Sequence, residues 1–221
     1  MKKRQFKRIT LILTIMSCLF FCQAEKVILE KESLYNNIRV IDEGRFLSLY
    51  CGNGHQSIMD KVHPDRLVFN YTKTMMAAFA FKKELPSDIL LIGEGGGSLP
   101  KTIQKHFPDI KLDIVEIDPE VDKVAQKYFL FKPSKNTKVF TIDGRMFVKK
   151  SAKKYDIVML DAFRGGYIPY HLLTKEFFTE VREILKPGGF VISNNRNRKK
   201  AAAIYNHPIL DIEPNITKDH I

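Results

Sequence analysis

Several acidic residues of this sequence stand where an apolar run ends, and side chains in such places could act on a bound ligand. Glu116 lies at the end of the run over 111–117, Asp143 follows the run over 138–142, and Asp161 follows the run over 156–160. A carboxylate can accept hydrogen bonds from hydroxyl or amino groups, and it can act as a general acid or base. If the runs are parallel strands, their carboxyl ends meet at one edge of a sheet, and these side chains share one site.

A glycine loop, residues 93–98, follows another apolar run over 88–92 and precedes a helical pattern over 99–105. This order predicts a buried strand, a tight turn and a helix N-terminus, which is the junction where a nucleotide-like ligand binds. Glycine suits such a turn because a residue without Cβ lets the backbone bend sharply and approach a ligand closely.

The residue types within the glycine loop favour one class of ligand. Gly93, Gly95 and Gly97 fit the loop of S-adenosylmethionine-binding domains better than the dinucleotide fingerprint, whose sixth position is here Ser98. Glu94 favours the same class, since its carboxylate would repel a pyrophosphate and attract a cationic sulfonium. The loop therefore predicts S-adenosylmethionine, or its decarboxylated form, as the ligand.

The acidic residues can then be given roles around such a nucleoside. Glu116 could accept both ribose hydroxyls, and the alternative is a solvated loop carboxylate. Asp143 could accept from the adenine amino group while Gly144 leaves room for the ring, and the alternative is a cap on the short helix that follows. Asp161 could orient the substrate or the methionine-derived end of the ligand.

The remaining elements alternate in a way that predicts an α/β domain. Apolar strands are separated by helices, which implies right-handed crossovers and a doubly wound parallel sheet of the S-adenosylmethionine-dependent methyltransferase type. Asp118 precedes Pro119, a pair that predicts a helix N-cap rather than a ligand contact. The expected strands are 88–92, 111–117, 138–142, 156–160 and 189–193, and the expected helices are 119–129, 145–151 and 174–185.

Before the glycine loop the pattern is different and predicts a small N-terminal β-region. Residues 35–50 read as a hairpin, 56–65 as a polar connection, and 67–81 as a helix with apolar residues at near-helical spacing. We therefore expect an N-terminal hairpin region and helix over 25–84, a nucleotide-binding domain over 85–195 and a basic irregular tail over 196–221.

The first 24 residues have the pattern of a leader. Basic residues precede an apolar run over 9–22 and a small-residue cleavage site, which predicts a signal peptide or a short membrane anchor. Without the basic residues of this leader the formal charge falls from +11 to +6. The remaining basic residues are scattered over helix faces or lie in the tail, so no nucleic-acid partner is expected.

Cysteine and histidine usage excludes metal and disulfide chemistry from the prediction. Cys18 and Cys22 lie in the leader, which leaves Cys51 alone in a mature chain, where we interpret it as a structural thiol. The six histidines form no metal-ligand spacing, and we interpret them as surface or packing residues.

Taken together, the motifs resemble the spermidine synthase family in order and spacing over about residues 35–195. The resemblance implies a small N-terminal β-region on a seven-stranded methyltransferase-like domain, decarboxylated S-adenosylmethionine as propyl donor and a polyamine as acceptor. By that resemblance Glu116 would hold the ribose, Asp143 the adenine end and Asp161 the reactive part of the site. The segments that carry it are Ile92-Gly93-Glu94-Gly95-Gly96-Gly97-Ser98, Val115-Glu116-Ile117-Asp118, Asp143-Gly144-Arg145, Tyr155-Asp156-Ile157-Val158-Met159-Leu160-Asp161 and Leu173-Thr174-Lys175-Glu176-Phe177-Phe178.

The chain also departs from that family at the acceptor side. Arg164 stands where these enzymes carry a second aspartate, and a fixed cation about 4 Å from an ammonium group would cost about 4 kcal/mol at an effective dielectric of 20. Gly96 replaces an aspartate of the family's loop, and the family's Tyr-His pair is not recognisable in Phe69-Asn70-Tyr71-Thr72-Lys73. These differences indicate a subgroup whose acceptor site differs from that of the family.

The C-terminus predicts a further difference. Only 26 residues follow Asn195, too few for the helix and antiparallel strand pair that complete the family's sheet, so we expect an open sheet edge unless the tail or a partner covers it. The alternatives to an aminopropyltransferase are a methyltransferase using the same pocket and a non-catalytic truncated relative. A homodimer is a further expectation. We expect an exported or inner-membrane-associated protein if the leader functions, and a cytoplasmic one if it does not.

Overall fold

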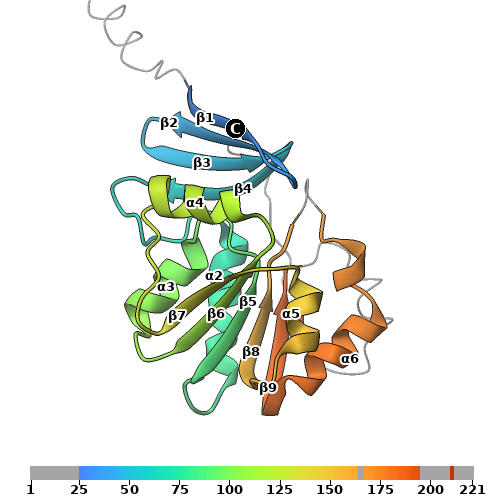
Figure 1. Ribbon diagram of the computed structural model, residues 1–221. Helices are drawn as coiled ribbons and strands as arrows, with labels where there is room; N and C mark the ends of the chain where they lie inside the picture. Colours follow the sequence, from blue (N-terminus) through green and yellow to red (C-terminus); the bar gives the residue numbers. More distant parts are fainter. Residues whose placement is uncertain (1–24, 164–166, 195–209, 212–221) are drawn as a thin grey trace, which may run out of the picture.

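The computed structural model describes residues 25–163, 167–194 and 210–211, and they form two sheets with helices packed around the second (Figure 1). An antiparallel sheet built from the N-terminal residues lies at one end of the molecule, above the carboxyl ends of a parallel sheet. The predicted leader, Arg164 and most of the predicted tail lie outside the described residues.

The N-terminal sheet is larger than the predicted hairpin. Its strands, in the order β1-β2-β3-β4, are β1 (Lys26–Glu32), β2 (Asn37–Glu43), β3 (Phe46–Cys51) and β4 (Gly54–Asp60). The expectation of a polar connection from residue 56 was wrong, because β4 pairs with β3 along its whole length. Polar residues of β4 are buried with partners: Asp60 is fully buried and accepts a hydrogen bond from Nη2 of Arg45 at 2.6 Å.

The second sheet is parallel throughout, in the order β10-β9-β8-β5-β6-β7, and confirms the predicted doubly wound domain. At one edge, the two-residue β10 from the tail pairs with Ile192 and Ser193, so part of the edge that we expected to be open is covered. The strands are β5 (Asp88–Ile92), β6 (Lys111–Glu116), β7 (Thr137–Thr141), β8 (Tyr155–Leu160), β9 (Leu185–Ser193) and β10 (Leu210–Asp211).

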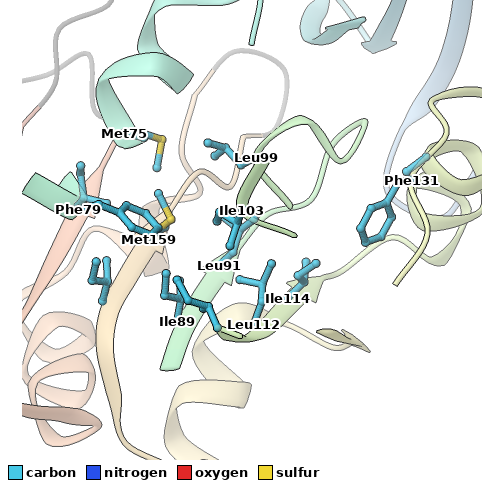
Figure 2. Packing of buried hydrophobic residues seen from close by; sticks show 14 residues of the cluster. Met75, Phe79, Ile89, Leu91, Leu99, Ile103, Leu112, Ile114, Phe131 and Met159 are labelled. Atoms are coloured by element: carbon cyan, nitrogen blue, oxygen red, sulfur yellow. The ribbon is translucent and has the colours of Figure 1, made fainter. Parts of the chain in front are cut away.

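Helices cover both faces of the parallel sheet because strands 88–92, 111–116 and 155–160 are apolar on both sides. On one face, helix α2 (Asn70–Ala77), the short η1 (Ala78–Phe81) and α3 (Ser98–His106) pack on the strands. Figure 2 shows Met75, Phe79 and Ile103 of this layer against strand residues. On the other face lie α5 (Gly144–Lys150), η2 (Tyr170–Leu172) and α6 (Lys175–Glu183).

Helix α4 (Pro119–Tyr128) connects the two sheets. Its Val121 and Val124 pack against buried residues of the N-terminal sheet. The prediction for Asp118 is confirmed, because its side chain caps α4 by accepting from the N–H of Glu120 at 3.0 Å. Asp118 also accepts from the hydroxyl of Ser33 at 2.5 Å, which ties the β1–β2 turn to the end of β6. Among the described residues, no helix is long and apolar enough to cross a membrane.

Candidate functional site

A cavity of about 950 Å³ lies between the N-terminal sheet and the carboxyl ends of the parallel strands. Most of the residues that the sequence singled out line this cavity: Gly93, Glu94, Gly95, Glu116, Asp143, Gly144 and Asp161. Gly97 is the exception, since it is absent from the lining. The sequence pattern therefore identified residues that the structure brings together at one cavity.

The glycine loop makes the sharp turn that its composition predicts. Gly93 has φ of 99°, and a Cβ on it would lie 2.4 Å from the backbone oxygen of Asp161. Gly97 has φ of 70° at the start of α3, and a Cβ on it would lie 2.7 Å from Cβ of Phe131. Glycine at 93 thus lets β5 and β8 end side by side, and glycine at 97 lets α3 pack closely on the segment after α4.

Glu94 is almost completely buried, with 6% of its surface exposed. Neither of its carboxyl oxygens has a hydrogen-bond partner among the described residues. Burial, reinforced by the nearby negative charges of Asp122 and Glu116, raises the pKa of Glu94 to about 9. The side chain is therefore a neutral acid at pH 7 in the ligand-free protein, and a cation nearby would favour its ionised form.

Glu116, at the end of β6, is held by backbone donors. Its Oε2 accepts from the N–H of Glu94 at 3.1 Å, and its Oε1 accepts from the N–H of Asp118 at 3.0 Å. Burial raises the pKa of Glu116, and these two hydrogen bonds oppose the increase. The carboxyl is fixed between the glycine loop and the α4 N-terminus, with lone pairs left over for a ligand hydroxyl.

Asp143 performs the helix-capping role that the sequence left open as an alternative. Its Oδ1 accepts from the N–H of Met146 at 3.0 Å, while Oδ2 lies 2.8 Å from Nε2 of His171. Gly144 is required for packing, since a Cβ on it would lie 2.6 Å from Cγ2 of Ile92. Capping does not exclude a ligand contact, because Asp143 also lines the cavity.

Asp161 is the acidic group nearest the end of β8. Its Oδ1 accepts from Nδ2 of Asn194 at 3.0 Å, and its Oδ2 lies 3.3 Å from the hydroxyl of Tyr71. Burial raises the pKa of Asp161 to about 7, although both hydrogen bonds oppose the increase. A carboxyl that titrates near neutral pH can accept a proton and release it again.

Asn194 and Tyr71 were missed by the sequence interpretation. Asn194 is 4% exposed, and its Oδ1 has no hydrogen-bond partner among the described residues although the residue lines the cavity. The rule that selected the acidic residues would also have selected Asn194, because it directly follows β9. Tyr71 gave no such signal, since it lies on α2 outside the parallel sheet.

Two histidines line the cavity, so the interpretation of all histidines as surface or packing residues was incomplete. His55 stacks on Tyr50 with ring centroids 4.4 Å apart and meets Phe69 edge to face at 5.1 Å, and Phe69 stacks on Tyr71 at 5.6 Å. Burial lowers the pKa of His55, so its ring is neutral at pH 7. A row of rings, the aromatic wall Tyr50–His55–Phe69–Tyr71, therefore runs from β3 to Asp161, and all of its members except Tyr50 line the cavity.

The cavity wall contains no metal centre within the described part of the chain, where no three metal-ligating side chains lie together. Cys51 is buried at the cavity, and burial raises the pKa of its thiol to about 12, which agrees with its interpretation as a structural thiol.

Comparison with known proteins gives consistent matches. The sequence model of the spermine/spermidine synthase domain matches residues 68–216. The polyamine aminopropyltransferase of Vibrio vulnificus is 38% identical over 193 residues, which are 82% of this chain and 62% of the relative. The human eEF1A lysine and N-terminal methyltransferase is 32% identical over 146 residues, which are 58% of this chain and 21% of the relative.

Solved structures share the fold. A probable spermidine synthase from Corynebacterium glutamicum matches with a TM-score of 0.69 at 20% identity, over 77% of this chain and 64% of that one. A spermidine synthase in complex with the transition state analogue AdoDATO matches with a TM-score of 0.66 at 16% identity, over 82% of this chain and 66% of that one. Human Methyltransferase-like protein 13 in complex with SAH matches with a TM-score of 0.53 at 29% identity, over 61% of this chain and 69% of that one.

These matches agree with the motifs, the two-sheet architecture and the cavity between the sheets. The chain spans 62% of the length of the Vibrio vulnificus relative. The family model covers about two thirds of this chain, from α2 to the tail. The chain belongs to the spermine/spermidine synthase family.

Proposed function

We propose that this chain binds decarboxylated S-adenosylmethionine or S-adenosylmethionine and transfers a carbon group from its sulfonium to an amine, nominally an aminopropyl group to a polyamine. The observation that carries the proposal is the meeting of the glycine loop, Glu116, Asp143 and Asp161 in one cavity at the strand ends. The named ligands of two structural relatives, SAH and AdoDATO, support a sulfonium-type nucleoside.

In this proposal the nucleoside lies across the strand ends with its ribose at Glu116 and its adenine at Asp143. The fixed carboxyl of Glu116 accepts the ribose hydroxyls, since the backbone donors of Glu94 and Asp118 hold it in place. The loop carboxyl of Glu94 gains from a sulfonium, because a cation favours the ionised form of a side chain that is otherwise buried and neutral.

The transfer step is a displacement at carbon. The lone pair of the amine attacks the carbon bound to sulfur, the carbon–sulfur bond breaks, and its electron pair stays on sulfur to give a neutral thioether. An ammonium acceptor must first lose a proton, and Asp161 is placed to take it with the help of a pKa of about 7. The aromatic rings of Tyr71, beside Asp161, and of Phe69, which stacks on Tyr71, both line the cavity and suit a cationic amine.

Calorimetry on the full chain tests the proposal with S-adenosylmethionine, decarboxylated S-adenosylmethionine and the product methylthioadenosine. We expect at least one of them to bind, with binding lost in Glu116→Ala. The proposal fails if none of them binds, or if Glu116→Ala binds as well as the natural chain does.

A methyltransferase is the second candidate, favoured by the 32% identity to the human eEF1A lysine and N-terminal methyltransferase. The two activities share the nucleoside pocket and differ in the donor. Tighter binding of S-adenosylmethionine than of its decarboxylated form, together with methylation of an amine, would replace the first candidate by the second. A non-catalytic relative is tested by Arg164→Asp, because aminopropyl transfer gained in that variant would exclude a collapsed site.

A further inference from the structure

Ser57 of β4 reaches from the N-terminal sheet into the glycine loop. The residue is 6% exposed, and its hydroxyl oxygen accepts a hydrogen bond from the N–H of Gly96 at 2.7 Å in a buried environment. Ser57 also lines the cavity. A residue of one sheet thus takes part in the ligand loop of the other.

The side chain of Ser57 fills the space that side chains on the loop would need. A Cβ on Gly95 would lie 2.9 Å from its Oγ. A Cβ on Gly96 would lie 2.8 Å from its Cβ and 3.0 Å from Cδ1 of Phe129. Two glycines and one serine therefore fit together, and no residue larger than glycine fits at 96 while Ser57 stays in place.

The hydrogen bond of Ser57 also takes the Gly96 amide out of the set of loop amides that remain for a ligand. Most N–H groups of the loop already have an acceptor. Gly93 donates to the carbonyl of Val115, and Gly97 donates to the carbonyl of Glu94. Glu94 donates to the carboxyl of Glu116, and Gly96 donates to Ser57. Among the described residues, no acceptor is found for the N–H groups of Gly95 and Ser98, and both residues line the cavity. The Gly96 N–H lies in the peptide plane between Gly95 and Gly96, so its hydrogen bond to Ser57 fixes the plane that follows Gly95 and limits the orientations open to the Gly95 N–H in the preceding plane.

We propose that Ser57 is a positioning residue, which holds Gly95 and Gly96 in the conformation that binds the nucleoside and so makes the N-terminal sheet part of the nucleoside site. The inference rests on the proposed function for the identity of the ligand. The position of the loop itself depends only on Ser57, Gly96 and their hydrogen bond.

The test compares Ser57→Ala with Ser48→Ala as a matched control. Ser48 is a fully buried serine of β3 in the same sheet, and its hydroxyl donates to Glu43 at 2.9 Å without lining the cavity. Calorimetry with methylthioadenosine should show about a tenfold higher Kd for Ser57→Ala, since a buried N–H loses its acceptor. Ser48→Ala should keep the natural Kd within about twofold, which is the scatter expected for independent sites.

Ser57→Cys separates the hydrogen bond from the filling of space. Cysteine keeps the site filled with a side chain of the same branching, but its sulfur is larger and is only a weak acceptor. We expect its Kd to be raised as in Ser57→Ala. A natural Kd in Ser57→Cys or Ser57→Ala, or an equal loss in Ser48→Ala, would overturn the proposal.

Amide hydrogen exchange at Gly96 provides a readout without any ligand. We expect the Gly96 amide to exchange at least about tenfold faster in Ser57→Ala than in the natural chain, and unchanged exchange in Ser48→Ala. If the natural chain bound no nucleoside, the proposed function would fail on its own, and the exchange rate would still decide the role of Ser57. Unchanged exchange at Gly96 in Ser57→Ala would then overturn that role.

Discussion

Nε2 of His171 lies 2.8 Å from Oδ2 of Asp143, so a histidine of η2 holds the carboxylate at the end of β7. The same carboxylate caps α5 through its other oxygen. Arg145 of α5 makes two hydrogen bonds of 2.8 Å to Glu180 of α6. Asp143 is thus oriented by α5 and η2 before any ligand arrives, which is the preorganisation that a binding residue needs.

Asp143→Ala should lose both stability and nucleoside affinity. Removal of the cap should lower the free energy of unfolding by about 1 kcal/mol, and loss of the proposed adenine acceptor should raise the Kd for methylthioadenosine about tenfold. Thr174→Ala is the control, because Thr174 caps α6 in the same way but does not line the cavity. Denaturant unfolding and calorimetry measure the two effects. Equal Kd values for methylthioadenosine in Asp143→Ala and Thr174→Ala would show that Asp143 does not contact the nucleoside.

The pKa of Asp161 should rise when its hydrogen-bond donor Asn194 is removed. Transfer should increase as pH rises through about 7, where Asp161 becomes able to accept a proton. Asn194 donates to the ionised carboxylate and lowers its pKa, so Asn194→Ala should shift the midpoint to higher pH. Carbon-13 NMR of the Asp161 carboxyl measures this shift even in a variant without activity. A midpoint that stays in place or falls would contradict the assignment.

Sequence patterns predicted the parallel sheet well because its signal is local and strong. Runs such as 88–92 and 156–160 are apolar on both faces, which few structures other than a covered parallel strand explain. The rule that ligands lie at strand ends then located Glu116, Asp143 and Asp161 together.

The N-terminal half of the site could not be predicted in this way. Strand β4 contains Ser57 and Asp60, whose burial is explained only by distant partners on the glycine loop and at Arg45. Tyr71 likewise reaches Asp161 across 90 positions of sequence. A pattern of residue types does not predict such long-range contacts, so the aromatic wall and the role of Ser57 could be found only from the three-dimensional structure.

A charge network at the opposite, amino-terminal ends of the strands should make the fold sensitive to acid. Lys186 lies 2.9 Å from Asp156 and 2.6 Å from Asp88, while the backbone N–H groups of Ser87 and Asp88 also donate to Asp156. Although burial opposes it, the pKa of Asp156 falls well below its ordinary value of 3.8, with Lys186 as the largest lowering cause. Stability from a lowered pKa is present above pH 4 and is lost as pH falls through the folded-state pKa.

Asp156→Asn should therefore lower the free energy of unfolding at pH 7 by roughly 2 kcal/mol, typical of hydrogen bonds to a charged group. Its loss of stability between pH 4 and 2 should be smaller than that of the natural chain. Urea unfolding at several pH values measures both quantities. The nucleoside Kd serves as the control and should not change, because Asp156 does not line the cavity. The same acid slope in both proteins would show that the network does not contribute.

Glu94 should produce the opposite dependence on pH. Its pKa is about 9 in the folded chain against an ordinary value of 4.5, so between these values the folded state binds more protons than the unfolded state does. Stability is then fully present below about pH 4.5 and falls as pH rises toward 9. In Glu94→Gln the side chain stays neutral, so this fall should be absent, and the variant should be more stable than the natural chain at pH 8.5 by roughly 1 to 3 kcal/mol. Urea unfolding at pH 5.5 and 8.5 measures the difference, and equal pH slopes in the two proteins would show that Glu94 is not a buried neutral acid.

If the carboxyl of Glu94 recognises a sulfonium, Glu94→Gln should also weaken the binding of S-adenosylmethionine more than the binding of its neutral thioether product, because only the cation gains from an ionised Glu94.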